Sequence, residues 1–239
     1  MKALLALLLL VSTAIAADSP AKLKVLLITG GHAFEPQFYE VFKNNASIAL
    51  TTAEHAKTGG ANAYERDDLL QQDVVVLYDM PMTLTDKQKT AFLSLFDKGI
   101  GVVVLHHALV SFPGWPDYER IIGGHYPKPP NEQPQVTEVV GYQHDMDVSV
   151  VIVDKDHPIT AGLADFTIHD EIYWGFHVGK DVHTLLTTPH PKSGKPLAWT
   201  RQEGKSRLVY LQLGHDHKAW ENPNYPVLVD RCIHWVAGK

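Results

Sequence analysis

Three histidines of this chain stand at or just beyond the ends of apolar runs, where a polar side chain has little packing role. They are His32, His107 and His215. Imidazole titrates near neutral pH and is the commonest side-chain ligand of transition metals. Three such groups in one place could act as acid, base and hydrogen-bond donors, or could hold zinc with one position left for water. No HExxH or CxxC motif supports a metal locally, so both alternatives stay open.

Two adjacent carboxylates, Asp170 and Glu171, add to this chemistry. They lie in the strand-like segment Ile168–Trp174, and consecutive strand residues point to opposite faces, so a proton-sharing pair is not expected. Burial among apolar neighbours would raise the pKa of Glu171 and suit it to acid-base catalysis. The alternative is a structural carboxylate that accepts backbone hydrogen bonds. The predicted catalytic residues are His107, Glu171 and His215, and the candidate zinc ligands are His32, His107 and His215.

The elements that must position these residues are buried strands. Four apolar runs are typical of strands covered on both faces; they are Lys22–Thr29, Asp73–Asp79, Val102–Leu105 and Ser206–Leu213. A capping box at Thr85 begins a helix that Gly99 ends, and this alternation predicts right-handed βαβ units and a parallel sheet. Ligands bind at the carboxyl ends of such strands, so the three histidines are expected to converge. If the strand continues past Leu105, only one of His106 and His107 faces the pocket, and His107 is predicted to be that one.

The second half of the chain contains antiparallel elements. Residues 136–142 and 148–153 alternate apolar and polar side chains, which predicts an inserted hairpin. No repeat or low-complexity segment interrupts the chain, so a single domain is expected over residues 22–237. Residues 1–16 have the pattern of a signal peptide, with Lys2, a short apolar run and cleavage after Ala16, which predicts a secreted or periplasmic protein with no membrane segment after cleavage. The alternative is a retained membrane anchor, which would need an apolar run of roughly 18 residues to span a bilayer.

Composition narrows the classes of partner. The 239 residues include 21 Lys and Arg against 27 Asp and Glu, a net charge of −6, and no basic run, which argues against nucleic acid or anionic lipid. The single cysteine, Cys232, makes an intramolecular disulfide impossible. Fourteen histidines suggest a functional site. A homo-oligomer is compatible with the sequence, which does not fix the oligomeric state.

Several motifs occur in an order that resembles the ThuA-like, trehalose-utilisation family. They are Leu105–Ser111, Gly123–His125, His157–Leu163, Asp170–Tyr173, Pro196–Trp199 and Leu213–Trp220. The resemblance implies a class I glutamine amidotransferase-like fold, a flavodoxin-like three-layer α/β sandwich with a mostly parallel sheet. It also implies a link to disaccharides and their 3-keto derivatives. Including aromatic side chains that could stack on a sugar, the predicted substrate-binding residues are His32, Trp115, His125, Asp170 and Tyr173.

The chain departs from the amidotransferase pattern at its central strand. Those enzymes carry a nucleophilic cysteine there, and this chain has His106 and His107, so glutaminase chemistry is excluded. Ser111 is not in a G-x-S-x-G elbow, which argues against an acyl-transfer triad. The leading hypothesis is an enzyme that hydrolyses or eliminates an oxidised (3-keto) glycoside. The alternatives are a non-catalytic sugar-binding module and a metal-dependent hydrolase with an unrelated substrate.

Overall fold

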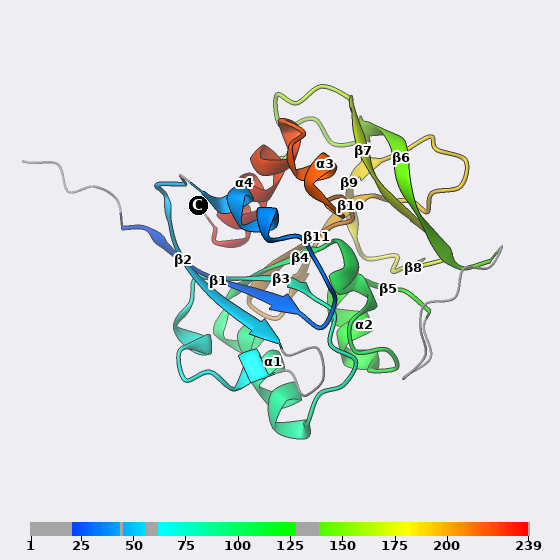
Figure 1. The fold of residues 1–239 in the computed structure, drawn as a ribbon. Coiled ribbons are helices and arrows are strands. Elements are labelled where there is room, and N and C mark those ends of the chain that lie inside the picture. Colours follow the sequence, from blue (N-terminus) through cyan, green and yellow to red (C-terminus); the bar gives the residue numbers. More distant parts are fainter. Residues whose placement is uncertain (1–20, 44, 56–61, 128–138, 239) are drawn as a thin grey trace, which may run out of the picture.

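The computed structural model describes residues 21–43, 45–55, 62–127 and 139–238. In this part of the chain a nine-stranded sheet with the order β2-β1-β3-β4-β11-β10-β9-β6-β7 forms the middle layer (Figure 1). Its strands are β1 (Leu23–Gly30), β2 (Ile48–His55), β3 (Val74–Asp79), β4 (Gly101–Leu105), β6 (Gly141–Ile152), β7 (Phe166–Trp174), β9 (His183–Thr187), β10 (Ala198–Glu203) and β11 (Ser206–Leu211). The short strands β5 (Gly124–His125) and β8 (His177–Val178) pair separately.

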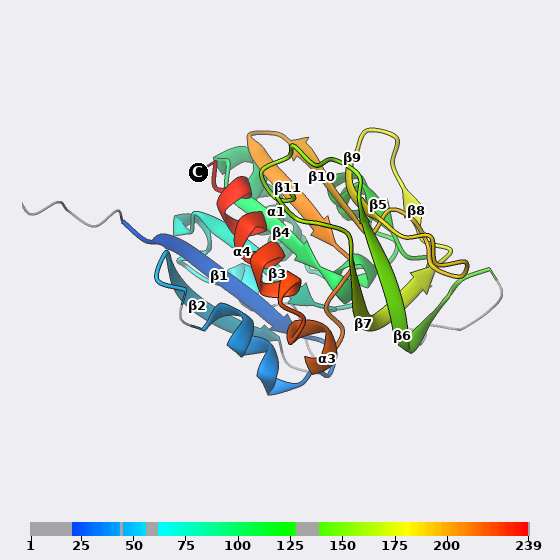
Figure 2. The same ribbon diagram turned by 90° about the horizontal axis from the view of Figure 1, so that it is seen from above.

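Helices cover both faces of the sheet (Figure 2). The α-helices are α1 (Asp86–Lys98), α2 (Pro116–Ile122), α3 (His217–Trp220) and α4 (Asn224–Val236), and the 3-10 helices are η1 (Pro36–Phe42), η2 (Asn62–Glu65), η3 (Leu69–Gln71) and η4 (His106–Val110). Alternate residues of each parallel strand enter one of two cores. Val103 and Leu105 pack with α4 and η1, whereas Val102 and Val104 pack with α1 and α2. Strands buried on both faces explain the continuous apolar runs.

The sheet consists of two halves. Strands β2, β1, β3, β4 and β11 are parallel, whereas β10, β9, β6 and β7 continue the sheet in antiparallel pairs. This arrangement confirms an α/β fold with a parallel central sheet and added antiparallel strands. Helix α1 begins and ends as predicted, because Thr85 and Gln88 form the reciprocal capping box and Gly99 adopts φ 80°. None of the helices in the described ranges is long and apolar enough to cross a bilayer.

The predicted hairpin over residues 136–153 is wrong, since Gly141–Ile152 is one strand that pairs with β7 and β9. A β-bulge interrupts its register, because Gln143 lies opposite Ile172 and Met146 lies opposite Asp170. Two residues, His144 and Asp145, therefore face a single residue of β7, and Asp145 adopts φ 57°. The polar stretch that resembled a turn is this bulge. Residues 136–138 and the predicted signal peptide, 1–16, lie outside the described residues.

Candidate functional site

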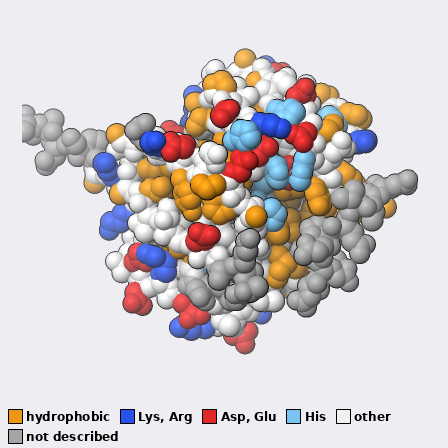
Figure 3. All heavy atoms as spheres, viewed as in Figure 1, with side chains coloured by type: hydrophobic (Ala, Val, Ile, Leu, Met, Phe, Trp, Pro, Cys, Tyr) orange, Lys and Arg blue, Asp and Glu red, His pale blue; other side chains and the backbone are white. Residues whose placement is uncertain are grey.

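A cavity of about 640 Å³, including its open mouth, lies at the carboxyl ends of the parallel strands. The histidines in its wall are His32, His106, His107, His144 and His215. Glu171 and Tyr173 from β7 join them, and Met80, Val110, Tyr126 and Tyr142 complete the lining. Histidine and carboxylate side chains gather on this face of the molecule (Figure 3). The convergence predicted for His32, His107 and His215 is thus confirmed.

His106 is positioned by an abrupt end to β4. The strand stops at Leu105, and His106 takes φ 48°, a left-handed conformation that is uncommon for residues with a Cβ. Because the chain then enters η4, His106 and His107 do not alternate as strand residues, and both line the cavity. The His106 Nδ1 lies 2.6 Å from the carbonyl oxygen of Gln212, to which it donates. The other ring nitrogen, Nε2, faces Glu171, His215 and Tyr173 in the cavity.

Glu171 is the centre of a charged cluster. Its Oε2 lies 2.9 Å from His106 Nε2 and 3.3 Å from His215 Nδ1, and its Oε1 lies 2.7 Å from His144 Nε2. Burial opposes ionisation, but the hydrogen bonds from His106 and His215 outweigh it and hold the pKa of Glu171 well below its usual range. The expectation of a raised pKa is therefore wrong, because the sequence did not reveal these partners. Glu171 is ionised at neutral pH.

His215 lies on the loop after β11 and is held by a buried carboxylate. Asp170 accepts backbone hydrogen bonds from Glu171 at 2.8 Å, Gly214 at 2.8 Å and His215 at 2.9 Å. Burial disfavours the protonated imidazole, but the hydrogen bond to Glu171 outweighs it and raises the pKa of His215. Asp170 is outside the cavity lining. It acts on the site by fixing the backbone that carries His215 and Glu171.

His107 and His32 form the opposite wall, with ring centroids 4.8 Å apart. The His107 ring hydrogen-bonds the backbone of Tyr78. Its buried Nε2 has no partner in the part of the chain that the structure describes, so Nδ1 makes that bond. Burial lowers the pKa of His107 well below its usual value, and the neighbouring His106 and His32 lower it further. Burial also lowers the pKa of His32. The neutral imidazoles of His32 and His107 therefore face the ionised carboxylate of Glu171 across the cavity.

Besides Asp170, two other predicted substrate-binding residues, Trp115 and His125, lie outside the lining of this cavity. Trp115 packs against the core residues Phe92 and Phe112. His125 belongs to β5, with its ring 4.8 Å from that of His177. The prediction for both rests on residue type or motif, and neither reveals which residues pack beside them in the fold. Tyr173 does line the cavity, with its hydroxyl 2.9 Å from His106 Nε2.

Two histidines of the cavity are not among the predicted site residues, His106 and His144. The sequence predicts a strand that continues past Leu105, in which His106 and His107 point to opposite faces and His106 points away from the pocket. Nothing in the sequence marks His144, because its approach to Glu171 depends on the bulge in β6. Its ring also stacks on that of His215 at 4.4 Å between centroids.

The cluster fits a divalent metal ion. His106 Nε2, Glu171 Oε2 and His215 Nδ1 lie 2.9 to 3.3 Å from one another. The ligand atoms of a tetrahedral zinc ion are roughly 3.3 Å apart, since each lies about 2.0–2.1 Å from the metal. Within the described ranges this is the one group of three such atoms close enough to share an ion. Of the predicted ligands it includes His215, whereas His32 and His107 belong to the opposite wall.

An α/β sheet with a parallel centre carries a histidine-rich cavity at its carboxyl edge, and histidines stand in place of a cysteine directly after β4. These features define a domain with an amidotransferase-like fold that lacks the glutaminase nucleophile. Residues 24–236 match the family ThuA, described as trehalose utilisation, and the chain belongs to that family. The search of curated proteins returned no significant match.

Solved structures of low sequence identity share this fold. A putative ThuA-like protein from Parabacteroides merdae ATCC 43184 aligns with a TM-score of 0.77 and 22% identity, over 92% of this chain and 91% of that one. A second putative ThuA-like protein, from Bacteroides uniformis ATCC 8492, aligns with a TM-score of 0.68 and 22% identity, over 93% of this chain and 95% of that one. The β-galactosidase of Rahnella sp. R3 has a TM-score of 0.57 and 15% identity, over 87% of this chain but 31% of the enzyme. At these identities the likeness establishes the fold alone.

Proposed function

We propose that this protein is an enzyme of carbohydrate metabolism that cleaves an oxidised (3-keto) glycoside or disaccharide, by hydrolysis or elimination. One observation carries the proposal: a single cavity places the two neutral imidazoles of His32 and His107 opposite the ionised carboxylate of Glu171, which contacts three further imidazoles. Membership in a trehalose-utilisation family supports a sugar as the substrate class. Cleavage of a 3-keto-glycoside needs a group that accepts a proton and a group that donates one, and the cavity contains both.

The 3-keto group acidifies the hydrogen on C2 of the sugar ring. A neutral imidazole takes this proton. The electron pair of the C2–H bond forms a C2–C3 double bond, and the negative charge of the resulting enolate lies on the 3-oxygen. The enolate then expels the C1 substituent as the C1–O bond breaks, and the departing oxygen takes up a proton. This gives an alcohol and an unsaturated keto-sugar, which is elimination. Addition of water across the new double bond completes net hydrolysis.

The residues divide between these steps by protonation state. His107, predicted as the base, has an unprotonated Nε2, and His32 is the neighbouring imidazole at the cavity mouth. In the metal-free site His215, whose pKa is raised, supplies a proton or a hydrogen bond to negative charge. A zinc ion held by His106, Glu171 and His215 would supply positive charge to the enolate oxygen. The hydrogen bond from His106 Nδ1 to the carbonyl oxygen of Gln212 already orients the His106 ring for binding such an ion through Nε2.

The test is turnover by the purified protein. It is incubated with methyl 3-keto-glucoside and with a 3-keto-disaccharide, and its metal content is measured in parallel. We expect His107→Ala and Glu171→Ala to lower kcat by about 10²- to 10⁴-fold, the usual contribution of an acid-base group, with sugar binding retained. The control is His183→Ala, an exposed histidine on β9 that lies outside the cavity lining.

Other outcomes would replace the proposal. Saturable sugar binding without turnover of any keto-glycoside would indicate a sugar-binding module. Stoichiometric metal with neither turnover nor sugar binding would favour a metal-dependent hydrolase of an unrelated substrate. As part of the same proposal, the protein is secreted or periplasmic, and its partner is a small-molecule sugar.

A further inference from the structure

A second cavity adjoins the first and shares His32 with it. It measures about 620 Å³ including its open side, and lies where β1 and β2 end. Phe34, Tyr39, Glu54 and His55 contribute its side chains. Because His32 lines both cavities, the two cavities lie side by side at this residue.

The floor of this second cavity is built by a close approach of two strands. Gly30 pairs with His55 in parallel register and adopts φ 95°. A Cβ at Gly30 would lie 2.3 Å from the carbonyl oxygen of His55, so any side chain there would collide with the backbone. A glycine at this point allows the loop from Gly31 to turn away sharply and leaves the space open.

A buried histidine in the wall has an unsatisfied hydrogen-bonding atom. His55 is 2% exposed, and its Nε2 lies 2.9 Å from Asp79 Oδ2, which also accepts from the Tyr64 hydroxyl at 3.1 Å. Among the described residues the His55 Nδ1 has no hydrogen-bond partner. Buried polar groups are normally paired, so an unpaired one calls for an explanation. With the Nε2 proton donated to Asp79, Nδ1 is an acceptor and would take a hydrogen from a ligand hydroxyl.

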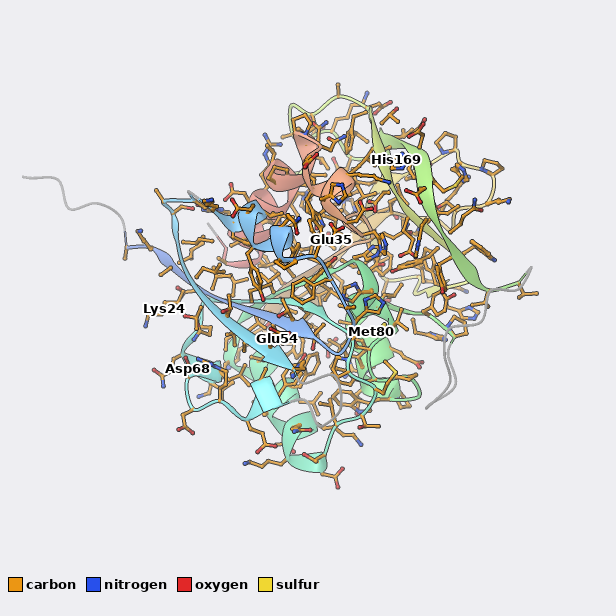
Figure 4. The ribbon with its side chains drawn as sticks, viewed as in Figure 1. Lys24, Glu35, Glu54, Asp68, Met80 and His169 are labelled. Carbon is orange, nitrogen blue, oxygen red and sulfur yellow. The ribbon has the colours of Figure 1, made fainter. Side chains whose placement is uncertain are left out.

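The rest of the wall has the composition of a site for a neutral polyhydroxylated ring. The Phe34 and Tyr39 rings lie 5.8 Å apart and offer apolar surface. The exposed carboxylate of Glu54, at the end of β2, can accept hydroxyl hydrogens (Figure 4). None of the described lining residues is Lys or Arg. An anionic ligand such as a phosphate would meet Glu54 without a compensating cation, which favours an uncharged sugar.

We propose that this second cavity binds the departing ring of a disaccharide whose oxidised ring occupies the first cavity. The bond that breaks then lies beside His32. This inference rests on the proposed function, and it adds that the preferred substrate has two rings. Glu54 and His55 are specificity residues in this scheme: they bind the ring that leaves and do not touch the reacting carbons.

The test compares substrates with and without a second ring. In the full-length protein, Glu54→Gln should lower kcat/KM for a 3-keto-disaccharide by about tenfold or more, since it weakens hydrogen bonds to a charged acceptor. The kcat/KM for methyl 3-keto-glucoside should change less than about twofold, the size of effect expected away from a contact. Glu40→Gln is the matched control, since Glu40 is exposed and paired with Lys43 outside both cavities.

Equal losses for both substrates, or no loss for either, would overturn the second ring site and leave the proposed function standing. Failure of the wild-type protein to turn over either substrate would instead overturn the proposed function. The ring site is then decided by calorimetric titration with unreacted trehalose and with methyl glucoside. Weaker trehalose binding by Glu54→Gln than by Glu40→Gln supports the site, and equal or absent trehalose binding refutes it.

Discussion

The substitution Asp170→Asn removes the support of the metal-ligand cluster without touching the cavity. The Asp170 carboxylate accepts three backbone N–H groups at 2.8 to 2.9 Å and is 2% exposed. Asparagine keeps one acceptor oxygen, so its amide nitrogen must face at least one of these N–H donors. Leaving a buried polar group unsatisfied costs about 1–3 kcal/mol, and the variant faces one or two such losses. We therefore expect the free energy of unfolding to fall by about 2–4 kcal/mol.

In a domain of this size, a loss of that magnitude lowers Tm by roughly 5–15 °C. Because the same bonds fix the loop that carries His215, zinc affinity should also fall by about 10- to 100-fold, as for supports of other metal ligands. Urea unfolding and zinc titration measure the two effects. Asp147→Asn is the control, since Asp147 is exposed and pairs with His169 away from the cluster. A variant as stable as wild type, with unchanged zinc affinity, would refute this account of Asp170.

Three further predictions concern protonation, the metal and the N-terminus. Below about pH 6.5 the unfolded chain protonates His107, whereas the folded chain keeps this imidazole neutral to a lower pH because burial lowers its pKa. The free energy of unfolding should therefore decrease as the pH falls below about 6.5, and His107→Gln should remove up to about 1.4 kcal/mol per pH unit of this slope, as measured by urea unfolding at several pH values. His106→Ala and Glu171→Gln should each weaken zinc binding by more than about tenfold in a chelator competition, and unchanged affinity would place the metal elsewhere. Protein exported from cells should begin at residue 17 by N-terminal sequencing, and an uncut N-terminus would instead favour a retained anchor.

Much of the fold could be predicted because its signals are local. The apolar runs of β1, β3, β4 and β11 record burial on both faces, and the Thr85 capping box and Gly99 mark the ends of α1. The prediction over residues 136–153 failed because a bulge within a long strand and a turn have similar polar composition. The two are distinguished by strand pairing with β7, which no local pattern records.

The sequence by itself determined that this is an α/β domain and that histidines gather at one edge of its sheet, since a parallel sheet brings the ends of its strands together. It also determined that the amidotransferase nucleophile is missing. Only the tertiary structure decided which side chains share a partner. The left-handed turn at His106, the bulge that presents His144 and the three N–H bonds of Asp170 bring distant segments around Glu171. Protonation states follow from these contacts, because a pKa depends on burial and on the charges nearby, and neither is a property of the residue alone.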